Sequence, residues 1–180
     1  MWVVFGKNID FFDNCVTINA KGEEGMQQEY PVLELANYIC STTSNKGKTV
    51  TNLQLQKTLY YIQGYFMKCL HSPAFGEDIY NWQYGPVVPE AYFEYNTNLS
   101  NPIQNIDVNA ADEFESDLRK KRKMYNLLHQ VIDKCLKFTA RELVSKTHRE
   151  DPWKNTELRQ KIDKSTIERY FVDNDPLGLG

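Results

Sequence analysis

Hydrophobic positions along most of the chain recur at the spacing of amphipathic helices. Pro31 suits a first helical position, because its fixed φ and missing N–H cost nothing there. The apolar residues that follow it keep helix-like spacing until the turn-forming SNKG: Leu33, Leu35, Ala36 and Ile39. This pattern predicts a first helix in the early thirties.

The next helix has a sharper start. Thr51 and Gln54 have the spacing of a capping box, in which each side chain satisfies the other residue's backbone N–H. Beyond this pair, five apolar residues follow one another at intervals of four, three, four and three, and therefore share a helix face: Leu55, Leu59, Ile62, Phe66 and Cys69. We expect this helix to end near Leu70, before HSPAFG.

A long helix is predicted over residues 111–137. Its apolar face is formed by Leu118, Tyr125, Leu128, Ile132 and Cys135. The basic run RKKRK follows DEFESD within it, and Glu115 with Arg119 and Asp117 with Lys121 have the i,i+4 spacing of helical ion pairs. Five consecutive cations could also grip phosphate, but the mixed charges favour a solvated helix face.

Two further capping boxes lie near the end of the chain. Thr139 precedes Glu142 by three residues, and Ser165 precedes Glu168 by three residues. They predict helix starts before LVSKTH and RYF. With the box at Thr51, they make a mainly helical domain the strongest structural prediction.

The segment IYNWQYGPVVPEAYFEY, residues 79–95, interrupts these helices. Aromatic side chains alternate with other residues over 79–84, a period of two that predicts a short extended stretch. Gly85 and Pro86 then change the direction of the chain, and Pro89 is suited to open a short helix.

The first 28 residues differ from the rest. WVVF and CVTI favour strands and AKGEEGMQQ is typical of a flexible joint, so residues 1–28 are predicted to be an extension, with a possible β-hairpin. We expect residues 29–175 to form the helical domain and residues 176–180 a C-terminal tail. The predicted fold class is therefore mainly α: a compact multi-helix single domain with a short extended segment near 79–84.

Composition narrows the class of protein. The 180 residues are 41% hydrophobic and 25% charged, as in a globular protein, and the net charge of −3 argues against a general nucleic-acid binder. No run approaches the roughly 18 apolar residues that span a bilayer, and the N-terminus lacks the pattern of a signal peptide. Four widely spaced cysteines form no CxxC pair, so we expect a cytoplasmic protein with free thiols and without a metal or cofactor.

The three histidines give a weak case for catalysis. His71, His129 and His148 show none of the spacing of a zinc site. His148 and Asp151 could form a general base, but no nucleophile motif, phosphate loop or carboxylate pair accompanies them. We favour the interpretation that these two residues end a helix and that the following Pro-Trp packs over it.

The aromatic residues of 79–95 leave two interpretations open. Trp82, Tyr84 and Tyr92 could fill the core between helices, since burying a large aromatic is worth several kcal/mol. Alternatively, Pro86 and Pro89 stiffen a partly apolar ledge that loses little entropy on binding another protein. Tyrosine and tryptophan also dominate contact energies at interfaces.

Two stretches of the chain resemble the Panacea domain family, which includes SocA-like antitoxins and phage-associated GepA-like proteins. They are LQLQKTLYYIQGYFM, residues 53–67, and FGEDIYNWQYGPVVPEAYFEY, residues 75–95. LVSKTHREDPW, residues 143–153, and the late ERYF are similar to the family's closing motifs, so the resemblance runs over about 31–172. Thr58 departs from the pattern, in which an aliphatic residue is common.

The resemblance implies an antitoxin that binds and neutralises a cognate toxin protein of a toxin–antitoxin system, and in some members presents it to a protease. The partner-binding candidates are the motif residues and the His148 group: Lys57, Tyr61, Gln63, Trp82, Tyr84, Pro86, Val87, Pro89, Tyr92, His148, Asp151 and Trp153. We expect no catalytic residues and no membrane partner, and nothing in the pattern bears on self-association.

Two rival functions stay open. An enzyme would need Lys57, Tyr61 and Gln63 to share a cleft with His148 and Asp151. A DNA-binding autoregulator would need a recognition helix, and the acidic balance makes nucleic acid an improbable partner.

Overall fold

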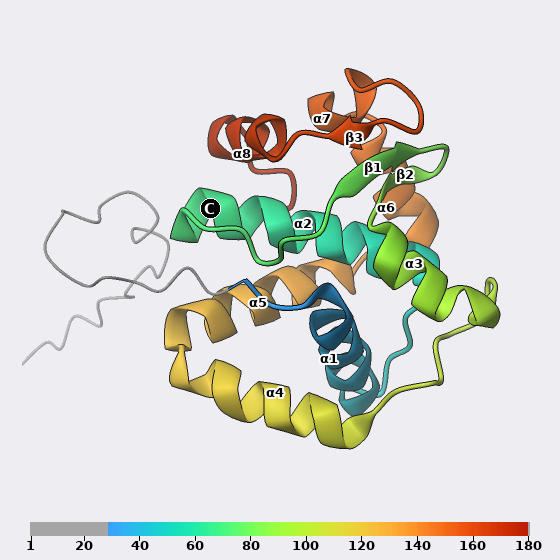
Figure 1. Ribbon diagram of the computed structural model, residues 1–180, viewed down its shortest axis with the longest axis vertical. Coiled ribbons are helices and arrows are strands. Elements are labelled where there is room, and N and C mark those ends of the chain that lie inside the picture. Colours follow the sequence, from blue (N-terminus) through green and yellow to red (C-terminus); the bar gives the residue numbers. More distant parts are fainter. Residues whose placement is uncertain (1–28, 180) are drawn as a thin grey trace, which may run out of the picture.

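The computed structural model describes residues 29–179, which form eight α-helices, a short 3₁₀ helix and a three-stranded sheet (Figure 1). The elements in chain order are α1 (Val32–Asn45), α2 (Asn52–Leu70), β1 (Ile79–Trp82), β2 (Gly85–Val87), α3 (Pro89–Tyr95), η2 (Asn96–Asn98), α4 (Val108–Lys120), α5 (Arg122–Cys135), α6 (Ala140–Thr147), α7 (Asp151–Lys154), β3 (Lys161–Ile162) and α8 (Lys164–Asp173). The mainly α fold class is confirmed. The predicted hairpin of residues 1–28 lies outside the described residues.

Helix α2 runs through the middle of the domain. In Figure 1, α1, α4 and α5 lie on one side of it, and the sheet, α7 and α8 lie on the other. The predicted apolar face is buried at Leu55, Leu59, Ile62 and Phe66. The residues between them are buried as well, because helices and strands pack on every side of α2.

A glycine sets how closely α8 approaches α2. A Cβ atom built on Gly64 would lie 2.4 Å from ring carbons of Phe171, well inside van der Waals contact. Phe171 in turn packs edge to face against Tyr60 and Tyr65 of α2, with ring centroids 5.6 and 5.1 Å apart. The glycine of the LYYIQG stretch therefore makes room for the C-terminal helix.

The sheet joins the predicted extended segment to a distant part of the chain. Its strands are ordered β2-β1-β3 and all pairs are antiparallel. Tyr80 pairs with Val87 across the tight turn, and Ile79 pairs with Ile162, more than eighty residues later. The extended segment was predicted, whereas β3 is too short and too polar to give a period-two signal.

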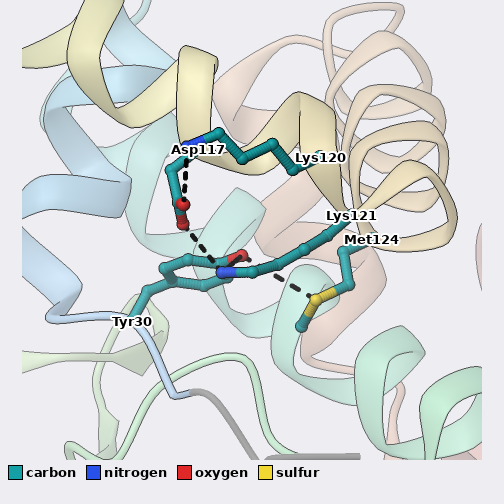
Figure 2. Close-up of polar contacts among 5 residues, drawn as sticks. All are labelled: Tyr30, Asp117, Lys120, Lys121 and Met124. Atoms are coloured by element: carbon teal, nitrogen blue, oxygen red, sulfur yellow. Dashed lines mark hydrogen bonds and ion pairs between the residues drawn. The ribbon is translucent and has the colours of Figure 1, made fainter.

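The predicted helix over 111–137 is wrong in one respect, because the chain breaks at Lys121 into α4 and α5. Helix α4 packs on α1 while α5 packs on α2, so the chain must turn between them although the local sequence favours helix. Figure 2 shows how the turn is held: the Lys121 ammonium lies 2.7 Å from Asp117 and 3.4 Å from the hydroxyl of Tyr30. The Tyr30 hydroxyl also donates to the sulfur of Met124 at 3.8 Å.

Both predicted ion pairs in this stretch are confirmed. Arg119 lies 2.5 Å from Glu115, and Lys121 pairs with Asp117 as described above. The side chains of Arg119 and Lys120 are largely exposed. The basic run is therefore largely paired with acidic residues on a solvated helix face, as the mixed charges predicted.

The three predicted capping boxes have different outcomes. Thr139 and Glu142 form a complete box at the start of α6. Thr51 caps α2 through the N–H of Gln54, but the Gln54 amide turns away to donate to the carbonyl of Phe138. The box at Ser165 is wrong, because the N-cap of α8 is Asp163 and the helix begins at Lys164, so Ser165 already lies inside it.

Residues after α8 pack back onto the domain. Leu177 is buried, and its backbone N–H donates to the hydroxyl of Tyr65 at 2.9 Å. Lys134 of α5 donates to the carbonyl of Gly178 at 2.8 Å. Within residues 29–179, no helix is long and apolar enough to cross a bilayer.

Candidate partner-binding surface

The aromatic side chains of residues 79–95 divide between core and solvent. Tyr84 and Phe93 are 61% and 59% exposed, while Trp82 and Tyr92 are half-buried. The GPVV backbone between them is buried, and Tyr95 points into the core. Each of the two interpretations that the sequence left open is thus right for part of this segment: some of its aromatic side chains pack in the interior, and others face solvent.

Trp82, Tyr92 and Phe93 form one packed cluster between β1 and α3. The Trp82 ring centroid lies 5.0 Å from that of Tyr92 and 6.2 Å from that of Phe93, and Tyr92 and Phe93 are 5.5 Å apart, all edge to face. Tyr84 projects from the β1–β2 turn two residues after Trp82. We call these four residues the aromatic surface.

Buried polar side chains of α2 hold the backbone of the segment that carries this surface and of the loop before it. Gln63, fully buried, accepts hydrogen bonds from the N–H groups of Ala74 and Phe75 at 2.8 and 3.2 Å and donates to the carbonyl of Phe75 at 2.9 Å. Lys57, also fully buried, donates to the carbonyl of Pro86 at 2.9 Å. The loop at 74–75 and the outer side of the edge strand β2 have backbone polar groups without backbone partners, so these side chains supply the partners.

Two further residues of α2 extend the same arrangement toward α3. Gln56 accepts from the N–H of Val88 at 2.9 Å, and Asn52 donates to the carbonyl of Tyr92 at 2.9 Å. The two amides also bond to each other at 3.0 Å. We call Asn52, Gln56, Lys57 and Gln63 the polar ladder. Sequence reasoning did not identify Asn52 and Gln56, because isolated amides on a helix give no sign that they are buried.

The charge of Lys57 is poorly solvated. Burial lowers the pKa of this side chain to about 7, and no carboxylate lies within ion-pair distance in the described residues. Space around it is also restricted: a Cβ on Gly85 would lie 2.7 Å from the Lys57 Cε and 2.8 Å from the Thr147 hydroxyl. Gly85 has φ +101°, which side chains rarely allow. Only glycine fits here.

A buried carboxyl is held by the next turn of α2. Glu150 is 3% exposed and accepts hydrogen bonds from the hydroxyls of Tyr60 and Tyr61 at 2.9 and 2.7 Å. Burial raises the pKa of Glu150 to about 7, and the two tyrosine bonds oppose that shift. The predicted candidate Tyr61 is fully buried and ties α2 to the start of α7.

The three candidates of the THREDPW stretch have separate roles. His148 ends α6 and stacks on Trp153 with ring centroids 3.9 Å apart, so the predicted helix end at His148 with the tryptophan over it is confirmed. The prediction is wrong for Asp151, which begins α7 and does not end α6. Trp153 donates its indole N–H to the carbonyl of Trp82 at 3.0 Å. Asp151 is exposed and pairs with Lys154 at 3.3 Å. Burial, and then the charge of Lys57, lower the pKa of His148.

This geometry separates the twelve candidates into two groups. Exposed or half-buried are Trp82, Tyr84, Pro89, Tyr92, His148, Asp151 and Trp153; buried are Lys57, Tyr61, Gln63, Pro86 and Val87. The buried group cannot touch a partner while the domain stays folded, and it positions the segment that carries the exposed aromatics. The side chains that an enzyme would need in one cleft are therefore split between the interior and solvent. Among residues 29–179, no cluster of three or more His, Cys, Asp or Glu side chains could hold a metal ion.

Comparison with known proteins gives one match. A family model described as "Antitoxin SocA-like, Panacea domain" matches residues 55–154, which are 100 of the 180 residues. The matched region runs from α2 through α7 and contains the aromatic surface and most of the polar ladder. No curated protein and no solved structure shows significant similarity to the chain.

Proposed function

The chain belongs to the SocA-like Panacea domain family of antitoxins, and from this premise we propose that it captures a partner toxin directly on its aromatic surface and so neutralises it. The observation that carries the proposal is the contrast within one segment. The backbone of 74–92 is held by buried hydrogen bonds, while Tyr84 and Phe93 above it remain exposed.

Such an arrangement favours protein binding for two physical reasons. A backbone that is already fixed loses little conformational entropy when a partner docks. Tyrosine and tryptophan, as in Tyr84 and Trp82, are among the residues that contribute most to the binding free energy of protein interfaces. Trp82 is half-buried against Tyr92 and Phe93, so its position is set before contact.

We propose a non-enzymatic role. The family is one of antitoxins, and the motif residues Lys57, Tyr61 and Gln63 act in the fold as buried supports. Presentation of the captured toxin to a protease, which the family resemblance implies for some members, is a second step. A shorter half-life of the toxin on co-expression would support that step, and an unchanged half-life with full neutralisation would count against it.

Growth rescue tests the proposal. The protein is co-expressed with the product of a toxin-like reading frame adjoining its own, and affinity is measured on the purified pair. Tyr84→Ala and Phe93→Ala should each weaken binding tenfold or more, as interface aromatics do at about 1.4 kcal/mol per factor of ten. Val172→Ala, an equally exposed apolar residue on α8, is the control. Full rescue by a folded Tyr84→Ala, Phe93→Ala double variant would refute the aromatic surface as the binding site.

A further inference from the structure

A groove opens beside the aromatic surface. It has a volume of about 410 Å³ and is lined by Trp82 and Gln83 of the β1–β2 hairpin and by Leu158 and Arg159 of the loop before β3. Leu158 is 58% exposed. One wall is thus aromatic, the other aliphatic, and a cation lies at the edge.

The loop that carries Leu158 and Arg159 is held firmly against β1. The backbone N–H of Arg159 donates to the carbonyl of Asn81 at 2.6 Å. The side-chain amide of Asn81, buried under the loop, donates to the carbonyls of Trp153 and Thr156 at 3.0 and 2.5 Å. The position of Arg159 relative to Trp82 is therefore built into the fold.

Arg159 occupies a conformation that its residue type disfavours. Its φ is +68°, in the left-handed region where glycine or asparagine is usual. Backbone strain of this kind often marks a functional position. Its guanidinium makes no hydrogen bond or ion pair with the described residues, so nothing in the fold accounts for an arginine there.

Neighbouring cations are already neutralised. Lys154 pairs with Asp151 at 3.3 Å and Lys161 pairs with Asp78 at 2.7 Å. Arg159 is thus the one cation of residues 154–161 without an acidic partner among the described residues. A single free guanidinium suits one carboxylate, whereas binding a polyanion requires several free cations.

We propose that this groove binds a segment of the partner protein in which an apolar side chain is followed by an aspartate or glutamate. The apolar side chain lies between Trp82 and Leu158, and the carboxylate pairs with the Arg159 guanidinium, whose planar fork matches it. The proposal rests on the proposed function, since it specifies what the partner presents next to the aromatic surface.

Short peptides provide the probe. The full chain, labelled with ¹⁵N, is titrated at low salt with the capped peptide Gly-Phe-Asp-Gly, its Asn counterpart, and a Gly-Phe peptide with a free carboxyl terminus. The Trp82 indole signal, assigned with Trp82→Phe, reports occupancy. We expect millimolar binding of the Asp peptide, about three- to fivefold tighter than the Asn peptide, as for an exposed ion pair. Arg159→Gln should abolish that difference, and Arg122→Gln, distant on α5, should leave it unchanged.

Arg159→Gly separates binding from folding. Relief of the left-handed strain should leave the melting temperature equal to or above that of the parent protein, while the preference for the Asp peptide disappears. A lower melting temperature with the preference retained would show that the arginine is structural. Equal binding of the Asp and Asn peptides, tighter binding of the free carboxyl terminus, or no shift with any peptide would each overturn the proposal. If toxin rescue needs Tyr84 and Phe93 but not Arg159, this inference fails while the proposed function stands.

Discussion

The two sides of α2 are held to it by different kinds of interaction. On the side of α5, apolar residues such as Leu128, Val131 and Ile132 are buried, and charged residues such as Asp133 and Lys134 are on the part of the helix that faces solvent or the chain's C-terminal residues. On the side of the sheet, the polar ladder hydrogen-bonds directly to the backbone of residues 74–92. Helices satisfy most of their own backbone groups and need only an apolar face, whereas the loop at 74–75, the edge strand β2 and the ends of α3 need side-chain partners at defined positions.

This difference explains why so many motif residues are buried and polar. Apolar packing tolerates some sliding and repacking, whereas a hydrogen bond from Gln63 or Lys57 fixes one carbonyl or N–H. The ladder therefore sets the path of the chain beneath Trp82 and Tyr92. On this view motif residues such as Lys57 and Gln63 support the aromatic surface, and that surface is formed by residues that the support leaves exposed or half-buried.

The largest expected effect comes from filling the space beside Lys57. Gly85→Ala places a methyl group 2.7 Å from the Cε atom of Lys57, and it also forces a residue with a side chain to adopt φ +101°. Together these two effects should lower the free energy of unfolding by about 4 kcal/mol. Gly47→Ala is the matched control, because Gly47 also has positive φ but nothing within 4 Å, and should cost about 1 kcal/mol. Denaturant unfolding measures both. Equal losses would show that the contact with Lys57 is unimportant.

The pKa of Lys57 gives the next largest effect, on the dependence of stability on pH. The folded state holds the ammonium with a pKa near 7 and the unfolded state near 10.5, so between these values the unfolded chain binds more protons. In this residue's contribution, stability should therefore rise with pH from about 7 to 10.5, by roughly 1.4 kcal/mol per pH unit. Lys57→Met should remove that rise. If the free energy of unfolding rises equally steeply above pH 7 in the parent protein and in Lys57→Met, the fold does not lower the pKa of Lys57.

Glu150 should act in the opposite sense and more weakly. Its folded-state pKa lies near 7 and its unfolded value near 4.5, so the folded state binds more protons in between and loses stability as pH rises through that window. We expect a fall of about 3 kcal/mol from this group, absent in Glu150→Gln. Unfolding curves at several pH values between 4.5 and 7 test it. The contribution of Glu150 falls up to about pH 7 and that of Lys57 rises above it, so the sum of the two should have its minimum near pH 7. A maximum of this sum near pH 7 would exclude both pKa shifts.

Local signals in the sequence predicted much of the fold but little of the polar ladder that holds residues 74–92. The apolar stripe of α2, the ion pair of Glu115 with Arg119, and the box at Thr139 depend on residues close in sequence, and all are found. The break at Lys121 and the pairing of β3 depend on contacts between distant elements, which no local pattern contains. Likewise Lys57 and Gln63 were named through the family resemblance, but nothing in their spacing showed that they point inward.

The smallest effect tests where the helices near the C-terminus begin. Thr139 accepts from the N–H of Glu142 at 3.2 Å, and Thr139→Ala should cost about 1 kcal/mol, the usual loss for an N-cap. Ser165→Ala should cost almost nothing, because Ser165 is the second residue of α8 and caps no helix. Thermal unfolding of the two variants side by side makes the measurement. Neither residue belongs to the polar ladder, so both variants should keep the aromatic surface and full toxin capture. If the two variants lose stability equally, Ser165 does cap a helix, as the sequence predicted.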